Sequence, residues 1–166
     1  LQIVRGEELR TRSEYNYIEK AFIEPPRGIV LDRNGLALTE NEAYTDQTGI
    51  LKYRRLPRHP FAFSHVLGLV GRVSEGDSAR AGFTTIGKSA IEQYYNDRLA
   101  GTLGERDEER DAKGSIISHG LIRPPAVGEN ITTSIDAPLQ EELWRLLDQT
   151  MRERGFKGGA GIVFAI

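Results

Sequence analysis

The stretch PPRGIVLDRNGLALTEN, residues 25–41, carries the strongest local fold signal in the chain. Its apolar runs at 29–31 and 36–38 flank Asn34-Gly35, the dipeptide that best tolerates the positive φ angles of a tight hairpin turn. Apolar runs on both sides of such a turn are typical of two paired strands. We therefore expect a β-hairpin centred on these two residues.

The sequence around this hairpin predicts strands and loops. Residues 1–20 are charged with sparse apolar positions and suggest a partly exposed helix, or a helix and a strand, that leads into the fold. Residues 45–60 are turn-rich and basic, and residues 63–73 indicate a strand or a short helix followed by a strand. Residues 74–81 are small and polar, which predicts a loop.

The second half of the chain predicts a charged hairpin and two strands. The mixed charges of residues 104–114 are typical of a solvated hairpin or loop, which is a more common use of such runs than catalysis by carboxylates. Residues 114–125 and 129–135 have the apolar pattern of strands.

A helix is expected after these strands. Asp136 has the side chain of an N-cap, Pro138 suits a first helical turn, and Gly155 marks the end of the helix. We interpret Trp144 as a packing residue beside the apolar stripe. That stripe comprises Leu139, Leu143, Leu146, Leu147 and Met151.

Composition and charge exclude several classes of protein. With 39% hydrophobic and 28% charged residues, the 166-residue chain has the composition of a folded domain. Its net charge of −2 lacks the basic excess of a nucleic-acid-binding domain. The absence of cysteine excludes disulfides, zinc–thiolate sites and thiol catalysis. No apolar run reaches the roughly 18 residues of a membrane helix, and the first residues lack the layout of a signal peptide.

The last nine residues, GGAGIVFAI at 158–166, predict a strand buried on both faces. Such a strand would stop without a turn, a polar tail or a partner, and an unpaired apolar edge invites aggregation. We therefore expect residues 158–166 to begin a further domain, and residues 1–157 to form a domain of their own.

Residues 82–89, GFTTIGKS, match the G-x-x-x-x-G-K-S phosphate loop of nucleotide-binding proteins. A phosphate loop leaves a hydrophobic strand, whereas the eight residues before Gly82 read SEGDSARA. We interpret the match as a helix start, in which the Ser89 hydroxyl accepts the backbone N–H of Glu92 in a capping box. Glu92 would return that bond or carry its charge to a buried cation, and Lys88 would be an ordinary exposed lysine.

No other pattern in the chain predicts a catalytic or metal site. The three histidines, His59, His65 and His119, lack the i, i+4 spacing of a helical metal pair, and we interpret each as structural. The chain has neither a G-x-S-x-G elbow nor an S-x-x-K acylation motif. We expect no catalysis, no metal and no cofactor in this segment.

Several motifs, in this order, resemble the N-terminal pedestal, or dimerisation, module of class B penicillin-binding proteins. PPRGIVLDRNGLALTEN is similar to the R-G-x-x-x-D-R-x-G-x-x-L-A signature that opens the module. RRLPRHPFAFSHVLGLVGRV resembles the second motif, and IGKSAIEQYYNDRLAGTLGER the third, G-x-S-G-[IL]-E followed by a helix and L-x-G-x-x-G. PPAVGENITTSIDAPLQEELWRLL resembles the segment that leads into the transpeptidase domain, and GGAGIVFAI the first strand of that domain. The resemblance covers nearly the whole chain.

In that family the pedestal is not catalytic: it holds the serine transpeptidase domain away from the membrane and docks other cell-wall synthesis proteins. The resemblance implies an α+β fold of twisted antiparallel β-hairpins packed on two or three helices. It also implies that the motif residues are structural, namely Arg27, Gly28, Asp32, Arg33, Asn34 and Gly35 of the first motif, Arg55 and His65 of the second, and Gly87, Ser89 and Glu92 of the third.

One contact among these residues can be anticipated. A buried carboxylate is held most firmly by the fork of an arginine, and removing one partner costs about 3–5 kcal/mol because the other charge stays buried. We therefore expect Glu92 to pair with Arg33 or Arg27.

The chain departs from the family pattern at three points. Ala90 replaces the second Gly of G-x-S-G, which we expect to be a mild change at a helix start. Residues 58–60 occupy the place of a Gly in the second motif. The family also carries a sizeable head subdomain between the first two motifs, whereas about sixteen residues separate Tyr44 from Phe61. Either the head is short or missing near 44–61, or residues have been omitted there.

The resemblance implies a larger protein at the periplasmic face of a bacterial inner membrane, anchored by a helix before Leu1. Its S-x-x-K, S-x-N and K-T-G residues would follow Ile166, so this segment alone should bind no penicillin. The closer match is to elongation-type enzymes, which act in cell-shape maintenance with a SEDS-family glycosyltransferase and an MreC-type scaffold. The alternatives are a division-type enzyme, a small P-loop NTPase and a free-standing interaction module. A homodimer is left open, and no nucleic-acid partner is expected.

Overall fold

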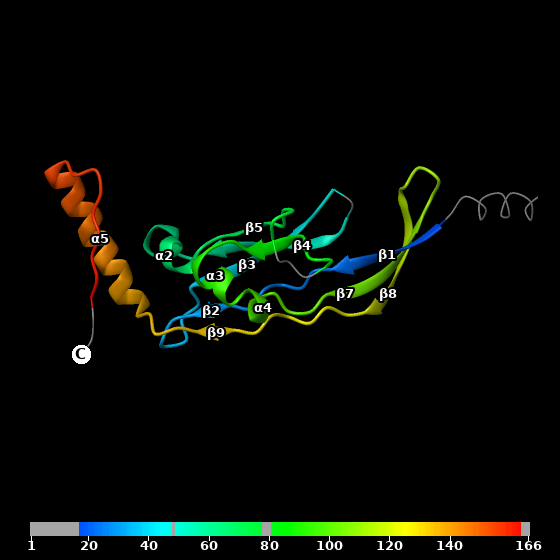
Figure 1. The fold of residues 1–166 in the computed structure, drawn as a ribbon, viewed down its shortest axis with the longest axis horizontal. Helices are drawn as coiled ribbons and strands as arrows, with labels where there is room; N and C mark the ends of the chain where they lie inside the picture. The colour runs from blue at the N-terminus through cyan, green and yellow to red at the C-terminus, as the bar shows by residue number, and fades with distance from the viewer. Residues whose placement is uncertain (1–16, 48, 78–80, 164–166) are drawn as a thin grey trace, which may run out of the picture.

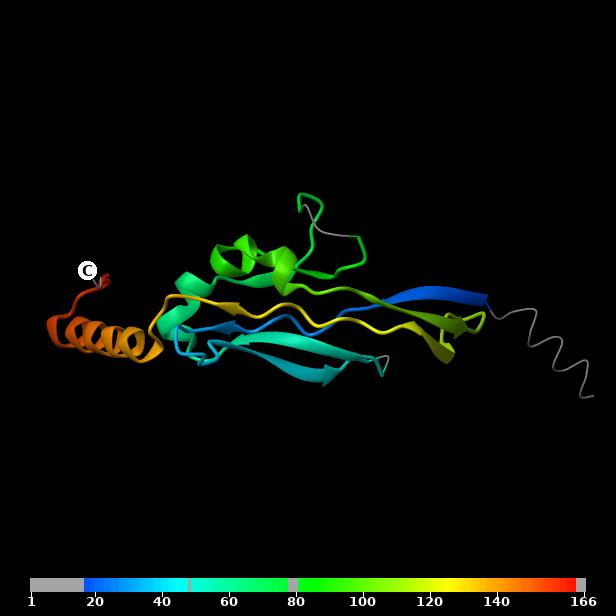
Figure 2. The same cartoon turned by 90° about the horizontal axis from the view of Figure 1, so that it is seen from below.

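The computed structural model describes residues 17–47, 49–77 and 81–163. These residues form an elongated module in which extended segments run along the length, a long helix lies at one end and a β-hairpin at the other (Figures 1 and 2). Antiparallel strands and helices are mixed along the chain, so the predicted α+β class is confirmed.

A three-stranded antiparallel sheet forms the end opposite the long helix (Figure 1). The strand β1, Tyr17–Ile23, pairs with β7, Gly104–Arg110, and β7 pairs with β8, Ile116–Arg123. The charged run at 104–114 is therefore one arm and the turn of a hairpin. Of the predicted lead-in at 1–20, residues 1–16 lie outside the described residues.

Two short strands from distant parts of the sequence meet in the middle of the module. The strand β2, Val30–Leu31, pairs in parallel with β9, Ile131–Thr132. The predicted turn at Asn34-Gly35 is present, with Gly35 at φ +87°, but its antiparallel ladder shrinks to one bridge between Leu31 and Ala37. The hairpin is thus shorter than predicted. Backbone bonds join Asp32 to Leu36 and Leu38 to Val30, and the N–H of Val30 then donates to the Thr39 hydroxyl instead of a backbone carbonyl, while β9 pairs with the opposite edge of β2.

A longer hairpin follows directly. The strand β3, Thr39–Thr45, pairs along its full length with β4, Leu51–Pro57, and backbone bonds of Asp46 with Ile50 and Gly49 close the end of this hairpin. The chain then forms α2, Pro60–Leu67, and the small hairpin of β5, Val70–Arg72, and β6, Thr85–Gly87. Two short helices, α3, Ala90–Tyr94, and α4, Asn96–Leu99, complete this part of the fold.

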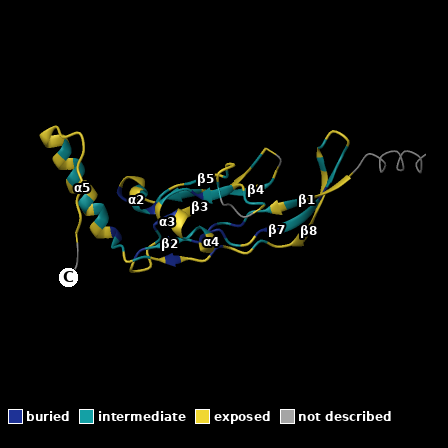
Figure 3. Ribbon diagram, viewed as in Figure 1, coloured by how far each residue is buried: buried dark blue, intermediate teal, exposed yellow. Residues whose placement is uncertain are grey.

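The hydrophobic core lies where these elements cross, and its residues are among the buried, dark blue segments of Figure 3. Its members come from β2, β9, α2, α4, the residue before β3 and the first residue of the long helix that follows β9. They are Val30, Leu38, Ala62, Phe63, Leu67, Leu99, Ile131 and Ala137.

The long helix α5, Ala137–Arg154, begins and ends as predicted. The Asp136 carboxylate accepts the backbone N–H of Leu139 at 3.2 Å, and Gly155 closes the helix in the left-handed conformation. Ala137 is its buried residue. Trp144 stacks on Phe61 with ring centroids 5.7 Å apart, as a packing role predicts.

The chain after α5 turns back along the helix (Figure 1). A Cβ on Gly161 would lie 3.1 Å from Leu143, and one on Gly159 would lie 3.7 Å from Met151. Ile162 and Val163, part of the predicted buried strand, are exposed and in no strand, and residues 164–166 lie outside the described residues. None of the described helices is both long and apolar enough to span a membrane.

Candidate functional site

A buried network of ionised side chains joins three distant segments near the core. Glu92, on α3, is 2% exposed. Its Oε2 lies 2.9 Å from Nη2 of Arg27 and accepts from Nε of the same arginine at 3.1 Å. Its other oxygen, Oε1, accepts from Nε of Arg55 at 2.7 Å. One carboxylate therefore ties the segment before β2 and the strand β4 to α3.

Two asparagines extend the network to the backbone. Asn96 Oδ1 accepts from Arg27 Nη1 at 3.2 Å and from the backbone N–H of Gly87 at 3.0 Å. Asn41 accepts from Arg55 Nη1 at 3.2 Å and donates to the Arg27 carbonyl at 2.6 Å. Every nitrogen of the two guanidinium groups thus has an acceptor, because Arg55 Nη2 also donates to the carbonyl of Gly28 at 2.8 Å.

The network holds two cations and one anion in a largely buried site. Burial lowers the pKa of the Arg55 guanidinium, the Glu92 carboxylate opposes that shift, and the nearby Arg27 adds to it. Arginine stays protonated in proteins, so this site is suited to cross-linking the chain and not to proton transfer.

Of the two arginines predicted as partners of Glu92, Arg27 forms the ion pair. Arg33 lies on the exposed side of the Asn34-Gly35 turn, 3.9 Å from Asp136. Arg55 is the second partner of Glu92, a pairing that the sequence did not indicate.

Two glycines of the motifs let backbones touch beside the network. A Cβ on Gly87 would lie 1.9 Å from the carbonyl oxygen of Glu92, and one on Gly28 would lie 1.9 Å from the carbonyl oxygen of Glu129. Real Cβ contacts are never this short, so a side chain at either position would force the segments apart.

Asp32 fastens the turn of the first motif to the start of α5. Its buried carboxylate accepts the backbone N–H groups of Asn34 at 2.7 Å, Leu36 at 2.8 Å and Ala137 at 3.3 Å. Burial alone would raise the pKa of Asp32, but these hydrogen bonds hold it below its ordinary value. The carboxylate therefore stays ionised and rigidifies the turn.

Ser89 does not cap α3, contrary to the prediction. Its hydroxyl accepts the backbone N–H of Leu69 at 3.1 Å, and it makes no side-chain bond to the helix. The next residue, Ala90, is the first residue of α3 and has φ +46°, so the helix does not begin with the regular geometry that a capping box requires. Ala90 was expected to be a mild replacement for Gly, but the left-handed region disfavours any residue with a Cβ.

Lys88 was predicted to be an ordinary exposed lysine, but it forms an ion pair with Asp77. Its Nζ lies 2.5 Å from the Asp77 carboxylate and 3.3 Å from the Ser74 hydroxyl. The hydrogen bond from Lys88, followed by those from Ser74, lowers the pKa of Asp77 to about 2. Since residues 85–87 form the strand β6, the phosphate-loop match has neither the free lysine nor the open loop that nucleotide binding needs.

The histidines do not gather at a site. His65 is exposed in the last turn of α2 and is not part of the network around Glu92. His59 lies 3.3 Å from Glu141. No cluster of three or more acidic residues, histidines and cysteines suited to a metal occurs in the described ranges.

Sequence reasoning missed a second cluster, on the face of β7. Glu108 is 1% exposed and lies between Arg106, whose Nη2 is 2.5 Å away, and Arg110, which also contacts Glu19. The sequence pattern could have predicted this cluster, because charges of alternating sign at every second residue of a strand share one face.

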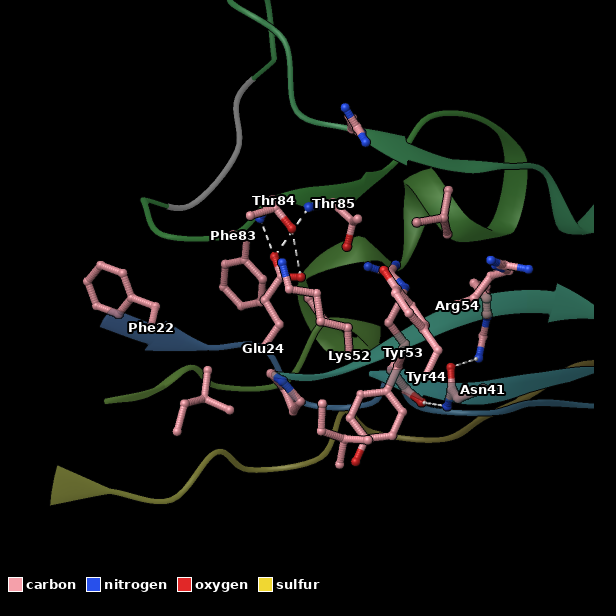
Figure 4. A pocket seen from close by; sticks show the side chains of 18 of the residues that line it. Phe22, Glu24, Asn41, Tyr44, Lys52, Tyr53, Arg54, Phe83, Thr84 and Thr85 are labelled. Atoms are coloured by element: carbon pink, nitrogen blue, oxygen red, sulfur yellow. Dashed lines mark hydrogen bonds between the residues drawn. The ribbon is translucent and has the colours of Figure 1, made fainter. Parts of the chain in front are cut away.

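A cleft of about 290 Å³ lies next to the network, between the end of β1 and the β3–β4 and β5–β6 hairpins (Figure 4). Glu24 projects into it and accepts the backbone N–H groups of Thr84 and Thr85 and, at 2.9 Å, the hydroxyl of Thr84. The side chains around it mix cations and aromatic rings: Arg27, Lys52, Arg54, Arg55, Arg72, Phe22, Tyr44, Tyr53 and Phe83.

Comparison with protein families and curated sequences gives consistent matches. The family model described as Penicillin-binding Protein dimerisation domain matches residues 47–133. A Haemophilus influenzae protein named Peptidoglycan D,D-transpeptidase MrdA is 26% identical over 241 residues, covering 98% of this chain and 36% of its own length. The protein of that name from Escherichia coli K12 is 25% identical over 225 residues, covering 89% and 36%.

The chain thus spans about a third of the length of these relatives. Both alignments are longer than the 166 residues of the chain, so the relatives carry residues without a counterpart here. A 35% identical match to MrdA of Acinetobacter baumannii covers 49% of the chain over 88 residues.

Solved structures show the same fold. A Pseudomonas aeruginosa PBP2, crystallised with WCK 5153, is similar over 80% of this chain with a TM-score of 0.57 and 29% identity. A complex of PBP2 with MreC from Helicobacter pylori also covers 80% of this chain, with a TM-score of 0.59 and 19% identity.

Proposed function

The chain belongs to the penicillin-binding protein dimerisation domain family, and we propose that it serves as the non-catalytic pedestal of an elongation-type peptidoglycan D,D-transpeptidase. The observation that carries this proposal is the match to MrdA proteins over 98% of the chain and 36% of the relative. The aligned segment has no S-x-x-K motif in its sequence, so the acylated serine would belong to the remaining length.

The motif residues act as structural cross-links in this proposal. A pedestal must keep the distance and direction between its two ends, and the buried contacts of Glu92 with Arg27 and Arg55 fix three segments relative to one another. The bonds of Asp32 to Ala137 fix the base of α5 in the same way. Asn34, Gly35, Gly28, Gly87 and Ser89 shape the turns and close approaches around these contacts.

We propose that the head subdomain of the family is reduced to the short connection between Thr45 and Leu51. The strands β3 and β4 are paired to their last residues on both sides of this connection. The residues of the relatives that lack a counterpart would then be inserted here.

The proposed cellular setting follows the relatives. The intact protein would be anchored by an N-terminal helix, act at the periplasmic face of the inner membrane and begin its transpeptidase domain near residue 158. An MreC-type scaffold is the partner that the Helicobacter pylori complex supports, and a SEDS-family glycosyltransferase is the second proposed partner. Neither a division-type enzyme nor a P-loop NTPase is favoured by any contact described above.

Fluorescent penicillin gives the first test. The complete gene product should be labelled, whereas the 166-residue chain should not. Labelling of the isolated chain would overturn the non-catalytic role.

The second test separates positioning from catalysis. In the complete protein, Arg55→Lys keeps the positive charge but loses the fork that contacts Glu92, Asn41 and Gly28. We expect cross-linking of peptidoglycan in cells to fall while penicillin acylation of the purified protein changes less than about twofold. Arg154→Lys on α5 is the control, and an equal loss of acylation and cross-linking would contradict the pedestal role.

A further inference from the structure

One strand at the cleft has an open edge. The hairpin of β3 and β4 forms a two-stranded sheet, so β4 has no strand partner on its other side among the described residues. Five consecutive residues of β4, Leu51 to Arg55, line the cleft. Since successive side chains point to opposite faces of a strand, a cleft that touches all five borders the edge of β4 and not one face.

The alternation of hydrogen bonds along the β3–β4 ladder shows which backbone groups of β4 point toward its open edge. The backbone bonds from Asp46 to Ile50 and from Arg58 to Leu38 close the two ends of the β3–β4 ladder. In an antiparallel ladder every second residue bonds to the partner, so Lys52 and Arg54 face β3. The N–H and C=O groups of Leu51, Tyr53 and Arg55 therefore point toward the open edge. Pro57, which has no N–H, occupies the same set of positions.

The charge around this edge is positive although the chain as a whole has a net charge of −2. Five cations line the cleft, of which Arg27 and Arg55 are paired with Glu92, and its one acidic residue, Glu24, is already bonded to Thr84 and Thr85. Arg72 has no ion pair within the described residues. Lys52 and Arg54 have partly exposed partners at 3.4 Å and 3.6 Å, which water screens strongly.

Apolar surface accompanies the cations. Phe22, Tyr44 and Leu51 line the cleft and are 51%, 41% and 52% exposed. Figure 4 shows the rings of Phe22 and Tyr44 on opposite sides of Glu24 and Lys52. A strand with alternating acidic and apolar side chains would complement this pattern on its two faces.

We propose that the open edge of β4 docks an extended, acidic segment of a partner protein, which adds to the β3–β4 hairpin as a third strand. The backbone groups of Leu51, Tyr53 and Arg55 supply the pairing, and Lys52, Arg54 and Arg72 supply the preference for acidic side chains. This inference deepens the proposed partner-docking role of the pedestal and rests on it.

A synthetic peptide tests the inference on the 166-residue chain. The probe is acetyl-Glu-Val-Glu-Val-Glu-Val-Glu-amide, followed by NMR titration and amide hydrogen exchange. We expect the amides of Leu51, Tyr53 and Arg55 to gain protection, whereas Lys52 and Arg54, already bonded to β3, change little. The same peptide with Lys for Glu should bind at least about tenfold more weakly, and so should the acidic peptide with Pro for its central Val.

Matched variants test the edge and the charge separately. Tyr53→Pro removes the N–H at the open edge and leaves the β3–β4 bonds intact, so it should abolish binding. Tyr53→Thr keeps the N–H, so its binding constant for the acidic peptide should fall by less than half. Arg54→Glu and Arg72→Glu, both exposed, should each weaken binding about threefold to tenfold, and Arg154→Glu on α5 should not.

Three outcomes would overturn the inference: no binding of the acidic peptide, equal binding of its proline form, or protection at another strand. Equal binding of a disordered polyglutamate would reduce the site to a general anion surface and also overturn strand addition. Self-association of the chain through β4 would identify a second copy as the occupant instead of an acidic partner. None of these results affects the penicillin-labelling experiment, so the two proposals fail independently.

Discussion

Two glutamates of this protein, Glu92 and Glu108, each lie between two arginines and are 2% and 1% exposed. Glu92 takes its arginines from positions 65 and 37 residues earlier in the chain. Glu108 takes its own from the same strand, two residues to either side. The chemistry is the same in both regions, but the topology is not.

The difference shows what a buried ion pair contributes in each place. The arginine side chains at Glu92 are 8% and 7% exposed, so they cannot turn to water when the carboxylate is lost. Those at Glu108 are 12% and 27% exposed and lie on an outer sheet, so they can. The first cluster therefore specifies how distant segments assemble, whereas the second covers one face of a hairpin that local pairing already holds.

The largest expected effect comes from Glu92→Gln. The two buried guanidinium groups would lose their counter-charge, and the free energy of unfolding should fall by about 3–5 kcal/mol. Urea unfolding monitored by circular dichroism measures it. A loss below about 1 kcal/mol would mean that the long-range cluster is no more important than a surface pair.

Gly87→Ala should have the next largest effect. Its Cβ would lie 1.9 Å from the carbonyl oxygen of Glu92, so β6 and α3 would have to separate, at a cost of about 1–3 kcal/mol. Gly120→Ala on β8 is the control in the other region, because its Cβ would meet nothing within 4 Å. If both variants unfolded at the same urea concentration, the close approach would not matter to stability.

Glu108→Gln should cost about 1 kcal/mol, because Arg106 and Arg110 remain able to reach water. The difference between wild type and variant should shrink further in 1 M salt, where exposed charges are screened. Thermal unfolding at low and high salt measures both effects. A loss as large as that of Glu92→Gln would remove the contrast between the two regions.

The smallest expected effect is an increase in the free energy of unfolding. Ala90 holds a positive φ two residues before Glu92, and Ala90→Gly should stabilise the protein by about 0.5–1 kcal/mol after the entropy cost of glycine in the unfolded chain. Ala100→Gly, at a residue with φ −69°, should destabilise it instead. The two midpoints in urea unfolding should move in opposite directions.

Local patterns predicted the parts of the fold that depend on neighbours in sequence. Asn34-Gly35 forms a turn with a positive φ, and α5 begins at the Asp136 cap and ends at Gly155. In each case a side chain or a missing Cβ acts within four residues. The pairing of β2 with β9 depends on a segment about 100 residues away, and no local pattern encodes it.

The candidate site was predicted only in part, because it also depends on contacts between segments that are distant in the sequence. Glu92 was identified because it follows Ser89 at the spacing of a capping box and lies in the third motif. Its partner was left open between Arg27 and Arg33, because which of the two faces inward is a tertiary property. Arg55 reaches the site only through the register of β3 and β4. The capping prediction for Ser89 failed because it assumed regular helical geometry from Ala90 onward, whereas Ala90 has a positive φ.

The parallel pairing of Val30–Leu31 with Ile131–Thr132 also determines when the middle of the module can fold. The chain is synthesised from its N-terminus, so the first strand must wait for the second, and at about 5–20 residues per second the 100 intervening residues take roughly 5–20 s to appear. During that interval Val30, buried in the finished protein, has no β9 to cover it. The middle of the module is thus completed late in synthesis, after both hairpins that flank it have had time to form.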